Sequence, residues 1–291
     1  MKIIGYYNSF ERQEVLSRLN LSTLTHLNYA FLLPRPDGTA YLRDEEDARR
    51  AINIATTNGL KAFISVGGWC DGNVILNDVF NRICDSKITL DILIQNIISV
   101  VEKFGFDGID LDWEFPTAKR QMVFCYMVDR LSNYTKSKGK GFSIAIHHSV
   151  KGEENYKFIS AINDEVVSKV DWLNIMTYDC EKEPNHSSLQ LAEKCIDYWV
   201  KDRGVDKKKI MIGIPLYSRP SFKKYYEFVD ENHANAFKDF IGDESLNGIY
   251  MAREKAYYAK FNCGGLIIWA INYDSLVSKY SLLQAISTIQ G

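Results

Sequence analysis

The sequence predicts an α/β fold, a (β/α)8 TIM barrel in a single domain that spans residues 1–291. Eight short runs rich in Val, Ile, Leu and Phe recur along the chain. Most are almost continuously apolar, which is typical of strands buried on both faces of a parallel sheet. Helix-like segments separate these runs, and eight strands that alternate with helices predict this barrel. A length of 291 residues is ordinary for one such domain.

The predicted strands are spaced so that a helix fits between neighbours. They are Lys2–Tyr7, His26–Leu32, Lys61–Gly68, Gly105–Glu114, Gly141–His148, Val170–Tyr178, Lys209–Tyr217 and Gly264–Ile271. The clearest predicted helices are Glu45–Thr57, Leu90–Phe104, Gln121–Lys138 and Leu189–Asp202. The longest irregular connection runs from Tyr217 to Gly264 over about 46 residues, which is short for an independent domain. A helix at Met251–Phe261 and a second around Ala234–Ile241 would fill it, so we expect loops there and no second domain.

Composition narrows the class of protein. Apolar residues make up 46% and charged residues 25% of the chain, as in a globular protein with a large core. The formal net charge of −2 gives no bias toward nucleic acid or an anionic membrane. The basic runs Lys136–Lys140 and Lys207–Lys209 fit solvated helix ends, with phosphate binding as the alternative reading. We therefore expect no nucleic-acid partner and no membrane partner.

The compartment stays open on sequence grounds. No apolar run reaches the length that spans a bilayer. A predicted strand begins almost at Met1 with no signal peptide before it, so the chain is expected to be cytoplasmic, or secreted with its signal removed. The six cysteines show no CxxC and no paired spacing, which favours free thiols over a disulfide frame or a zinc site.

The stretch FGFDGIDLDWEFP, residues 104–116, puts four acids into a predicted core strand. Side chains alternate along a strand, so Asp110, Asp112 and Glu114 share one face, with successive Cα atoms about 6.6 Å apart. Like charges in a poorly solvated site raise at least one carboxyl pKa, so that protons are shared. Glu114, the outermost acid, can then act as a general acid, with Asp112 placed to hydrogen-bond it and Asp110 behind. Asp107 breaks the parity and is expected to serve structure.

The alternative for these acids is an ion-paired or metal-bound cluster. No Lys or Arg lies on the strand beyond Lys103, and three collinear acids suit Mg²⁺ or Ca²⁺ poorly without more oxygen ligands. The five histidines have no metal-ligand spacing, and the sequence contains no P-loop, GxGxxG, GxSxG or HExxH motif. We therefore expect no metal and no cofactor.

Active sites of such barrels lie at the carboxyl ends of the strands, where this chain carries polar and aromatic residues. They are Tyr6, Phe31, Ser65, Gly67, Gly68, Trp69, Asp112, Glu114, His147, His148, Met176, Tyr178, Asp179, Tyr217, Arg219, Trp269 and Asn272. Taken singly, Tyr6, Ser65, Met176 and Trp269 would be interpreted as core filling, and only their joint match raises the functional interpretation.

The motif DGIDLDWE resembles the Asp-x-x-Asp-x-Asp-x-Glu signature of glycoside hydrolase family 18, the chitinase family. Four further motifs match in the expected order: SVGGW at 65–69, NIMTYD at 174–179, GIPLY at 213–217 and GGLIIWAINYD at 264–274. The resemblance runs from the first strand to the eighth. It is to a short form of the family, without the larger domain that some relatives insert after the seventh strand.

The resemblance implies a role for each matched residue. Glu114 would protonate the glycosidic oxygen, Asp112 would orient the substrate's acetamido group, and Asp110 would share protons behind them. Tyr178 would hydrogen-bond the acetamido oxygen, which itself attacks the anomeric carbon. Substrate contacts are implied for Tyr6, Phe31, Ser65, Gly68, Trp69, Met176, Asp179, Tyr217, Arg219 and Trp269. Tyr6 and Ser65 would hold Asp112 when it turns inward, and Trp269 would stack on the distorted sugar.

Three departures from the family pattern matter. His147 and His148 stand where small residues or proline are expected. Adjacent strand residues face opposite ways, so only one would face the cleft, to narrow a subsite or add a titrating group; a surface-capping pair is the alternative. Ser218 replaces a glycine after GIPLY. Without the inserted domain the groove should be shallower, which favours internal cleavage of a polymer.

The function that the resemblance implies is retaining, substrate-assisted hydrolysis of β-1,4-linked N-acetylglucosamine, through an oxazolinium intermediate, by a monomer. Chitin or its oligomers are the simplest substrates. Cleavage of N-glycans by an endo-β-N-acetylglucosaminidase and remodelling of peptidoglycan or spore cortex remain alternatives, because all need an N-acetyl group beside the scissile bond. A chitin-binding lectin without catalysis is an alternative of another class, disfavoured because Glu114 and Asp112 are both retained.

Overall fold

The protein has the predicted fold class, a (β/α)8 barrel. The computed structural model describes residues 1–289. The sheet order is β1-β13-β10-β9-β8-β7-β4-β2, and β1 also pairs with β2. These strands are β1 (Lys2–Asn8), β2 (His26–Pro34), β4 (Lys61–Gly68), β7 (Gly108–Trp113), β8 (Gly141–His147), β9 (Trp172–Met176), β10 (Ile210–Pro215) and β13 (Gly265–Trp269). Each coincides with one of the eight predicted runs.

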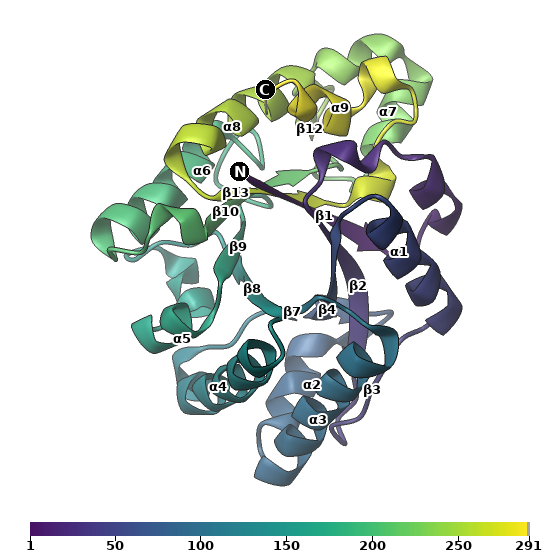
Figure 1. Cartoon of the computed structure of the whole chain (residues 1–291). Coiled ribbons are helices and arrows are strands. Elements are labelled where there is room, and N and C mark those ends of the chain that lie inside the picture. The colour runs from purple at the N-terminus through teal and green to yellow at the C-terminus, as the bar shows by residue number, and fades with distance from the viewer. Residues whose placement is uncertain (290–291) are drawn as a thin grey trace. The chain divides into compact units, whose positions relative to one another are not determined.

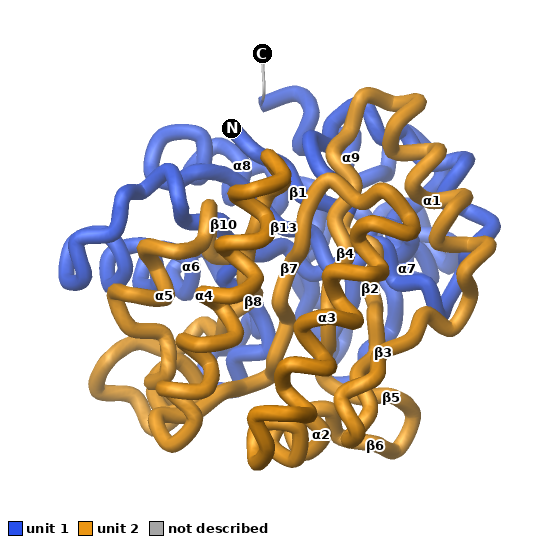
Figure 2. Tube along the Cα trace, turned by 60° about the horizontal axis from the view of Figure 1, so that its bottom comes forward, with its two compact units in different colours: residues 1–27, 174–291 blue, residues 28–173 orange. Residues whose placement is uncertain are grey.

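The chain divides into two compact units (Figure 2). One consists of residues 28–173, and the other of residues 1–27 together with the chain from Asn174 onward. The helices are α1 (Glu45–Thr57), α2 (Leu76–Ile83), α3 (Lys87–Phe104), α4 (Gln121–Ser137), α5 (Asp164–Lys169), α6 (Leu189–Ile196), α7 (Tyr225–Glu231), α8 (Ile249–Asn262) and α9 (Leu282–Ser287). We describe each unit by itself, and the prediction of a single domain stays a prediction.

In the unit of residues 28–173, the helices α3 and α4 lie side by side next to the strands (Figure 1). The helix α3 begins after Ser86, whose side chain accepts a hydrogen bond from the Ile88 amide, and it ends at Gly105 with φ 79°. Its buried residues recur at helical spacing: Leu90, Leu93, Ile94, Ile97, Val101 and Phe104. Burying each such side chain contributes about 1.5–3 kcal/mol. From α3 the chain continues through Asp107 into β7, which carries the acids.

The second unit contains the long connection between β10 and β13. Here α7 is followed by a 3-10 helix, His233–Phe237, and by a hairpin of β11 (Phe240–Ile241) and β12 (Glu244–Ser245). The predicted helix over Ala234–Ile241 is therefore wrong. Its apolar residues pattern like a short helix, but Gly242 adopts φ 60° and turns the chain back into the hairpin. The predicted helix over Met251–Phe261 corresponds to α8.

One predicted helix changes its type along its length, and four short helices were not predicted. The predicted helix Leu189–Asp202 ends as an α-helix at Ile196 and continues as a π-helix over Asp197–Asp202. The short helices α2, α5, α7 and α9 were not predicted. Each is six to eight residues long, which is too short for a helical period to stand out in the sequence.

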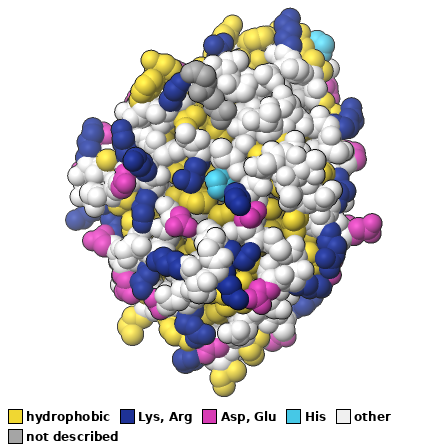
Figure 3. All heavy atoms as spheres, viewed as in Figure 1, with side chains coloured by type: hydrophobic (Ala, Val, Ile, Leu, Met, Phe, Trp, Pro, Cys, Tyr) yellow, Lys and Arg dark blue, Asp and Glu magenta, His cyan; other side chains and the backbone are white. Residues whose placement is uncertain are grey.

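The surface mixes charges of both signs, and Figure 3 shows Lys and Arg interspersed with Asp and Glu on the face it draws. None of the six cysteines, which all lie among residues 1–289, takes part in a disulfide. Among residues 1–289 no helix combines the length and the apolar character that crossing a membrane requires.

Candidate active site

Asp110 lies at the centre of a buried hydrogen-bonded group in the unit of residues 28–173. Its side chain is completely buried. The Ser65 hydroxyl donates to Oδ2 at 2.8 Å, and the Ser143 hydroxyl donates to Oδ1 at 2.7 Å. The parallel register explains this arrangement, because Ser65 on β4 and Ser143 on β8 both lie opposite Asp110. In this structure Ser65 bonds Asp110, and its contact with an inward-turned Asp112 stays a prediction.

Asp112 is the most perturbed carboxyl group of the strand. It is 4% exposed, and its Oδ1 has no hydrogen-bond partner among the described residues. Burial, followed by the nearby charges of Glu114 and Asp110, raises the pKa of Asp112 well above its ordinary value. The expected rise of a carboxyl pKa on this strand therefore falls on Asp112, and its protonated form is favoured. Glu114 follows β7 directly and is half-buried.

Asp107 has the structural role that its parity predicted. It precedes β7, at the end of the strand remote from Glu114. Its Oδ2 accepts a hydrogen bond from the Ala62 amide at 2.9 Å, and its Oδ1 accepts one from Lys61 Nζ at 3.1 Å. It thus joins the start of β7 to the start of β4.

Two glycines at the end of β4 allow close contacts. Gly67 lets the backbone of β4 approach β7, and Gly68 leaves room for the Phe31 ring. Gly67 and Gly68 end β4 with φ of 113° and 93°, conformations that side-chain-bearing residues rarely adopt. A Cβ on Gly67 would lie 2.3 Å from the carbonyl oxygen of Asp112, and one on Gly68 would lie 2.7 Å from the Phe31 ring. Phe31 is buried, whereas Trp69 is 56% exposed.

Gly67→Ala is expected to destabilise the protein by at least about 1 kcal/mol more than Gly72→Ala. The matched control Gly72 also has a positive φ, of 60°, but nothing lies within 4 Å of a Cβ built there. Both substitutions therefore strain the backbone, and only Gly67→Ala pushes on β7. Urea unfolding of the two variants checks this, and equal losses of unfolding free energy would contradict the close approach.

The pair His147 and His148 departs from the prediction that one ring faces the cleft and the other faces away. The strand β8 ends at His147, so strand alternation does not extend to His148. The two ring centroids lie 4.1 Å apart at an interplanar angle of 31°. His147 also packs edge to face against Phe115 at 5.1 Å and at a tilt against Phe158 at 5.0 Å. The two histidines are therefore part of an aromatic cluster that includes Phe115, the residue directly after Glu114.

In the second unit, Asp179 gathers several of the other predicted site residues. Tyr217 Oη donates to Asp179 Oδ2 at 2.7 Å, and Arg219 Nε donates to Oδ1 at 2.7 Å. His186 Nδ1 lies 3.3 Å from Oδ1. Burial by itself would raise the pKa of Asp179, but these three hydrogen bonds outweigh it and lower the pKa to about 2. Asp179 is thus a fixed negative charge, and its backbone has φ 63°.

Tyr6 and Trp269 form a second group in the same unit. They lie opposite each other on β1 and β13, and their rings meet edge to face at 5.8 Å. Tyr6 Oη accepts a hydrogen bond from Asn174 Nδ2 at 3.0 Å, on β9. Tyr6 and Tyr178 are buried, while Met176 and Trp269 are half-buried at the ends of their strands. The Tyr178 ring packs over Gly213, where a Cβ would lie 2.5 Å from it.

Sequence reasoning missed His186 and Lys255. His186 follows no recognisable motif, and only the fold brings it to Asp179. Lys255 is completely buried on α8, with burial lowering its pKa to about 7. A signal for it did exist: Ala252, Ala256 and Ala259 mark the buried face of α8 at helical spacing, and Lys255 lies on that face.

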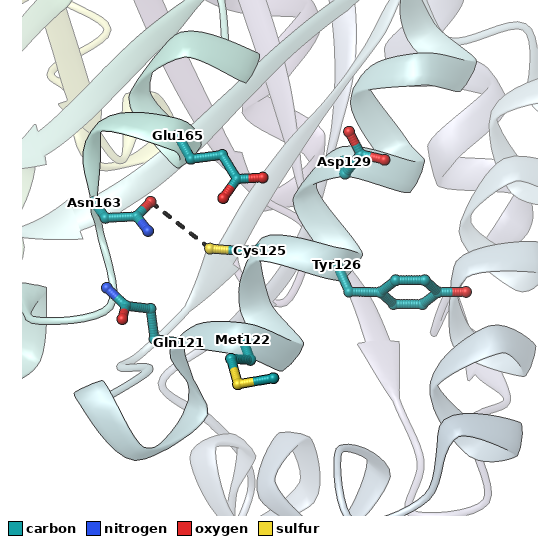
Figure 4. Close-up of a pocket in the computed structure, with 7 residues that line it drawn as sticks. All are labelled: Gln121, Met122, Cys125, Tyr126, Asp129, Asn163 and Glu165. Carbon is teal, nitrogen blue, oxygen red and sulfur yellow. Dashed lines mark hydrogen bonds between the residues drawn. The ribbon is translucent and has the colours of Figure 1, made fainter.

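A pocket of about 410 Å³ lies away from these groups in the unit of residues 28–173 (Figure 4). Side chains of α4 between Gln121 and Asp129 line it, together with Asn163 and Glu165 from the start of α5. Cys125 Sγ lies 3.7 Å from Asn163 Oδ1 across it. None of the predicted site residues lines this pocket, so we do not include it in the candidate site.

Comparison with known proteins gives one family and many relatives. The family model described as "Glycosyl hydrolases family 18" matches residues 2–274. Probable chitinase 10 of Drosophila melanogaster is 25% identical over 94% of this chain, and Nod factor hydrolase protein 1 of Medicago truncatula is 26% identical over 91%. These alignments cover 14% of the Drosophila protein and 84% of the Medicago protein.

Solved structures share the fold. The GH18 chitinase ChiB of Flavobacterium johnsoniae superposes with a TM-score of 0.86 at 24% identity, covering 99% of this chain and 93% of that one. A GH18 chitinase of Cycas revoluta, crystallised as a double mutant in complex with (GlcNAc)4, also gives 0.86, at 20% identity with both chains covered completely.

Proposed function

The chain belongs to the glycosyl hydrolases family 18 and is a glycoside hydrolase, and on this premise we propose that it cleaves β-1,4-linked N-acetylglucosamine in chitin or chito-oligosaccharides. The related proteins named chitinases, and the Cycas revoluta chitinase crystallised with N-acetylglucosamine oligomers, support this choice of substrate. The reaction we propose is substrate-assisted and retains the configuration at the anomeric carbon.

The observation that carries the proposal is the group of three acids, Asp110, Asp112 and Glu114, at the end of β7. Asp112 is buried and its protonated form is favoured, with Asp110 behind it and Glu114 half-buried beyond it. Three interacting carboxyl groups, two on β7 and one just after it, each in a different environment, have the means to pass a proton between them. A purely structural acid would instead be paired like Asp107, with a backbone amide and a lysine.

In the first step we assign Glu114 as the general acid. It gives its proton to the glycosidic oxygen as the bond from that oxygen to the anomeric carbon breaks. The carbonyl oxygen of the substrate's own acetamido group attacks the anomeric carbon, which forms an oxazolinium ion. Before this step Asp112 passes its proton to Glu114, and it takes the proton back when the cycle closes. As a carboxylate, Asp112 accepts a hydrogen bond from the acetamido N–H and stabilises the positive charge that develops there.

In the second step Glu114, now a carboxylate, takes a proton from water. The oxygen of that water bonds to the anomeric carbon on the face that the leaving group occupied, and the acetamido group is released. Glu114 returns to its protonated form, which closes the cycle. Two inversions at one carbon give net retention.

The second unit supplies the proposed substrate contacts. We assign Tyr178 Oη as a donor to the acetamido oxygen, which holds that oxygen for attack, and Asp179 as an acceptor for the same sugar. Asp179 suits this role because Tyr217 and Arg219 hold its charge and orientation. Trp269 offers a half-buried aromatic surface for the apolar side of the pyranose ring.

Purified protein and a fluorogenic chitotrioside test the proposal directly. We expect release of the fluorophore by the wild-type protein and a β-anomeric product by NMR. Binding of chito-oligosaccharides without turnover would favour the lectin alternative and contradict the enzymatic proposal. A parallel panel of N-glycan and peptidoglycan substrates distinguishes the three substrate classes, because the catalytic residues treat any N-acetyl group beside the bond alike.

The product series from polymeric chitin tests the preference for internal cleavage. The connection between β10 and β13 holds α7, a 3-10 helix, the hairpin of β11 and β12, and α8, and without a large inserted domain we propose an open groove that admits the middle of a polymer. Oligomers of mixed length are then expected early in the digest. A series dominated from the start by the disaccharide would contradict this part of the proposal.

A further inference from the structure

Lys255 is a cation buried without a partner carboxylate. Its side chain is completely inaccessible, and the described residues provide it with hydrogen-bond acceptors but no ion pair. An ammonium group removed from water loses its hydration, so a buried lysine that persists needs compensating contacts or a function. The mechanism proposed above makes no use of Lys255.

The three N–H donors of the ammonium group meet three acceptors from different parts of the unit. Lys255 Nζ donates to Ser187 Oγ at 2.6 Å, to Asn247 Oδ1 at 2.9 Å and to the Gly213 carbonyl at 3.3 Å. A charged lysine has three donors, one for each acceptor, whereas the neutral amine has two. Loss of the proton therefore leaves one of these buried acceptors without its hydrogen bond.

These contacts lead to the segment that carries Tyr178 and Asp179. Ser187 Oγ in turn donates a hydrogen bond to the Thr177 carbonyl at 2.7 Å. This carbonyl belongs to the peptide that joins Thr177 to Tyr178. Gly213 exchanges two hydrogen bonds with Thr177 Oγ1, at 2.8 and 3.1 Å. The chain from Nζ to the peptide before Tyr178 is thus only two hydrogen bonds long.

The segment that carries Tyr178 and Asp179 needs support from the residues around it. Asp179 has φ 63°, a left-handed conformation that costs free energy in a residue other than glycine and persists when its surroundings enforce it. The loop that contains Ser187 supplies that support, since His186 Nδ1 lies 3.3 Å from Asp179 Oδ1 and the Cys180 amide donates to the His186 carbonyl at 3.0 Å. Lys255 holds this loop through its hydrogen bond to Ser187.

We propose that Lys255 is a positioning residue that fixes Tyr178 and Asp179 through Ser187 and Gly213, and that its charge makes this fixation dependent on pH. The inference rests on the proposed function, because it concerns the same acetamido contacts. Lys255 does not touch the substrate. It acts by holding the peptide that orients the nucleophilic acetamido oxygen, so its loss should slow the chemical step more than it weakens binding.

The groups around Lys255 set the pH at which it acts. Burial dominates and lowers the pKa of Lys255 to about 7, while Asp239, Glu183 and Cys195 act in the opposite direction. The folded pKa lies below the unfolded value of 10.5, so the unfolded chain binds more protons between about pH 7 and 10.5. The contribution of Lys255 to stability therefore rises with pH over this window and is lost as pH falls through about 7.

Stability and activity should then move in opposite directions with pH. Deprotonation near pH 7 relieves the burial of a charge, but it removes one donor from the segment that carries Tyr178. A residue with a merely structural role would instead change both quantities in the same direction. Opposite pH trends of stability and activity are therefore the result that would support a positioning role for Lys255.

The experiment compares Lys255→Met with Lys255→Arg, which keeps a charge, and with Lys260→Met, an exposed lysine of the same helix. For Lys255→Met we expect kcat on a fluorogenic chitotrioside to fall about tenfold or more while KM changes less than about threefold. Lys255→Arg should recover part of this loss, and its kcat should no longer fall as pH rises through 7. Lys260→Met should match the wild-type protein.

A second readout is independent of activity. NMR of protein labelled at its lysine side chains should show one lysine that titrates near pH 7 in the wild type and is missing from Lys255→Met. If Lys255→Met does not fold, Ser187→Ala removes the transmitting hydroxyl and should lower kcat alone. A folded Lys255→Met with wild-type kcat and pH profile would overturn the inference, as would the absence of any lysine titrating below about pH 9. No turnover by the wild type, with the low lysine titration present, would count against the proposed function only.

Discussion

Glu114→Gln is expected to lower kcat on a fluorogenic chitotrioside by about 10²–10⁴-fold, because an amide has no proton to give to the glycosidic oxygen. The substitution keeps the shape of the side chain and removes only its acid function. Glu114 follows a fully buried strand, so its backbone position should survive the change. Binding of chitotriose, measured by calorimetry, should stay within a few-fold of the wild-type value.

Glu102→Gln is the matched control for this prediction. Glu102 is an exposed residue of α3 in the same unit and pairs with Lys138 at the surface. We expect its kcat to be unchanged. If Glu114→Gln kept full activity, the general acid would be a different residue and the proposed first step would be wrong.

Asp112→Asn is expected to reduce activity and raise stability together. The variant cannot take a negative charge, so it loses the stabilisation of the positive oxazolinium ion, and kcat should fall by about 10²–10³-fold. The unfolding free energy at pH 7 should rise by at least about 1 kcal/mol, since each unit of pKa difference is worth about 1.4 kcal/mol. Active sites commonly carry such a cost in stability.

The sign of the stability change follows from the direction of the pKa shift. The pKa of Asp112 in the folded protein lies above its unfolded value, so the folded state binds more protons across that interval. Its stabilising contribution is present below the unfolded pKa of about 3.8 and is lost as pH rises through the folded pKa. Asparagine has no such dependence, so wild type and variant should differ little in acid and most at neutral pH.

Urea unfolding at pH 4 and pH 7 measures this difference, with Asp78→Asn as the control. Asp78 is exposed on α2 in the same unit. The difference in unfolding free energy between Asp78→Asn and the wild-type protein should be almost the same at the two pH values. A variant Asp112→Asn that was less stable than wild type at pH 7 would mean that the Asp112 carboxyl is held by contacts that favour its charged form.

The strands were predictable because each carries its signal locally. The run Lys61–Gly68 is buried from Ala62 onward, as its continuous apolar character predicts, and β7 is buried at every position. The acids of β7 were assigned to one face by alternation alone, and Asp107 was correctly separated from them. Alternation failed at His148, because the sequence does not show that β8 ends at His147.

The residues that sequence reasoning missed act through distant partners. His186 meets Asp179 across a turn, and Lys255 reaches Ser187 over 68 residues of chain. The helical periodicity around Ala252 and Ala256 places Lys255 on a buried face, but it does not say which acceptors lie there. The hairpin of β11 and β12 was mistaken for a helix for a similar reason, since its pairing partner lies across Gly242.

The sequence alone determined the fold class, the eight strands and the face of β7 on which Asp110 and Asp112 lie. These features follow from side-chain periodicity, which is a property of neighbouring residues. The tertiary structure decided that Ser65 and Ser143 bond Asp110, that burial raises the pKa of Asp112 and that Lys255 is held by three acceptors. Burial and hydrogen-bond partners depend on which distant segments pack together, so they set the chemistry of each group only once the chain has folded.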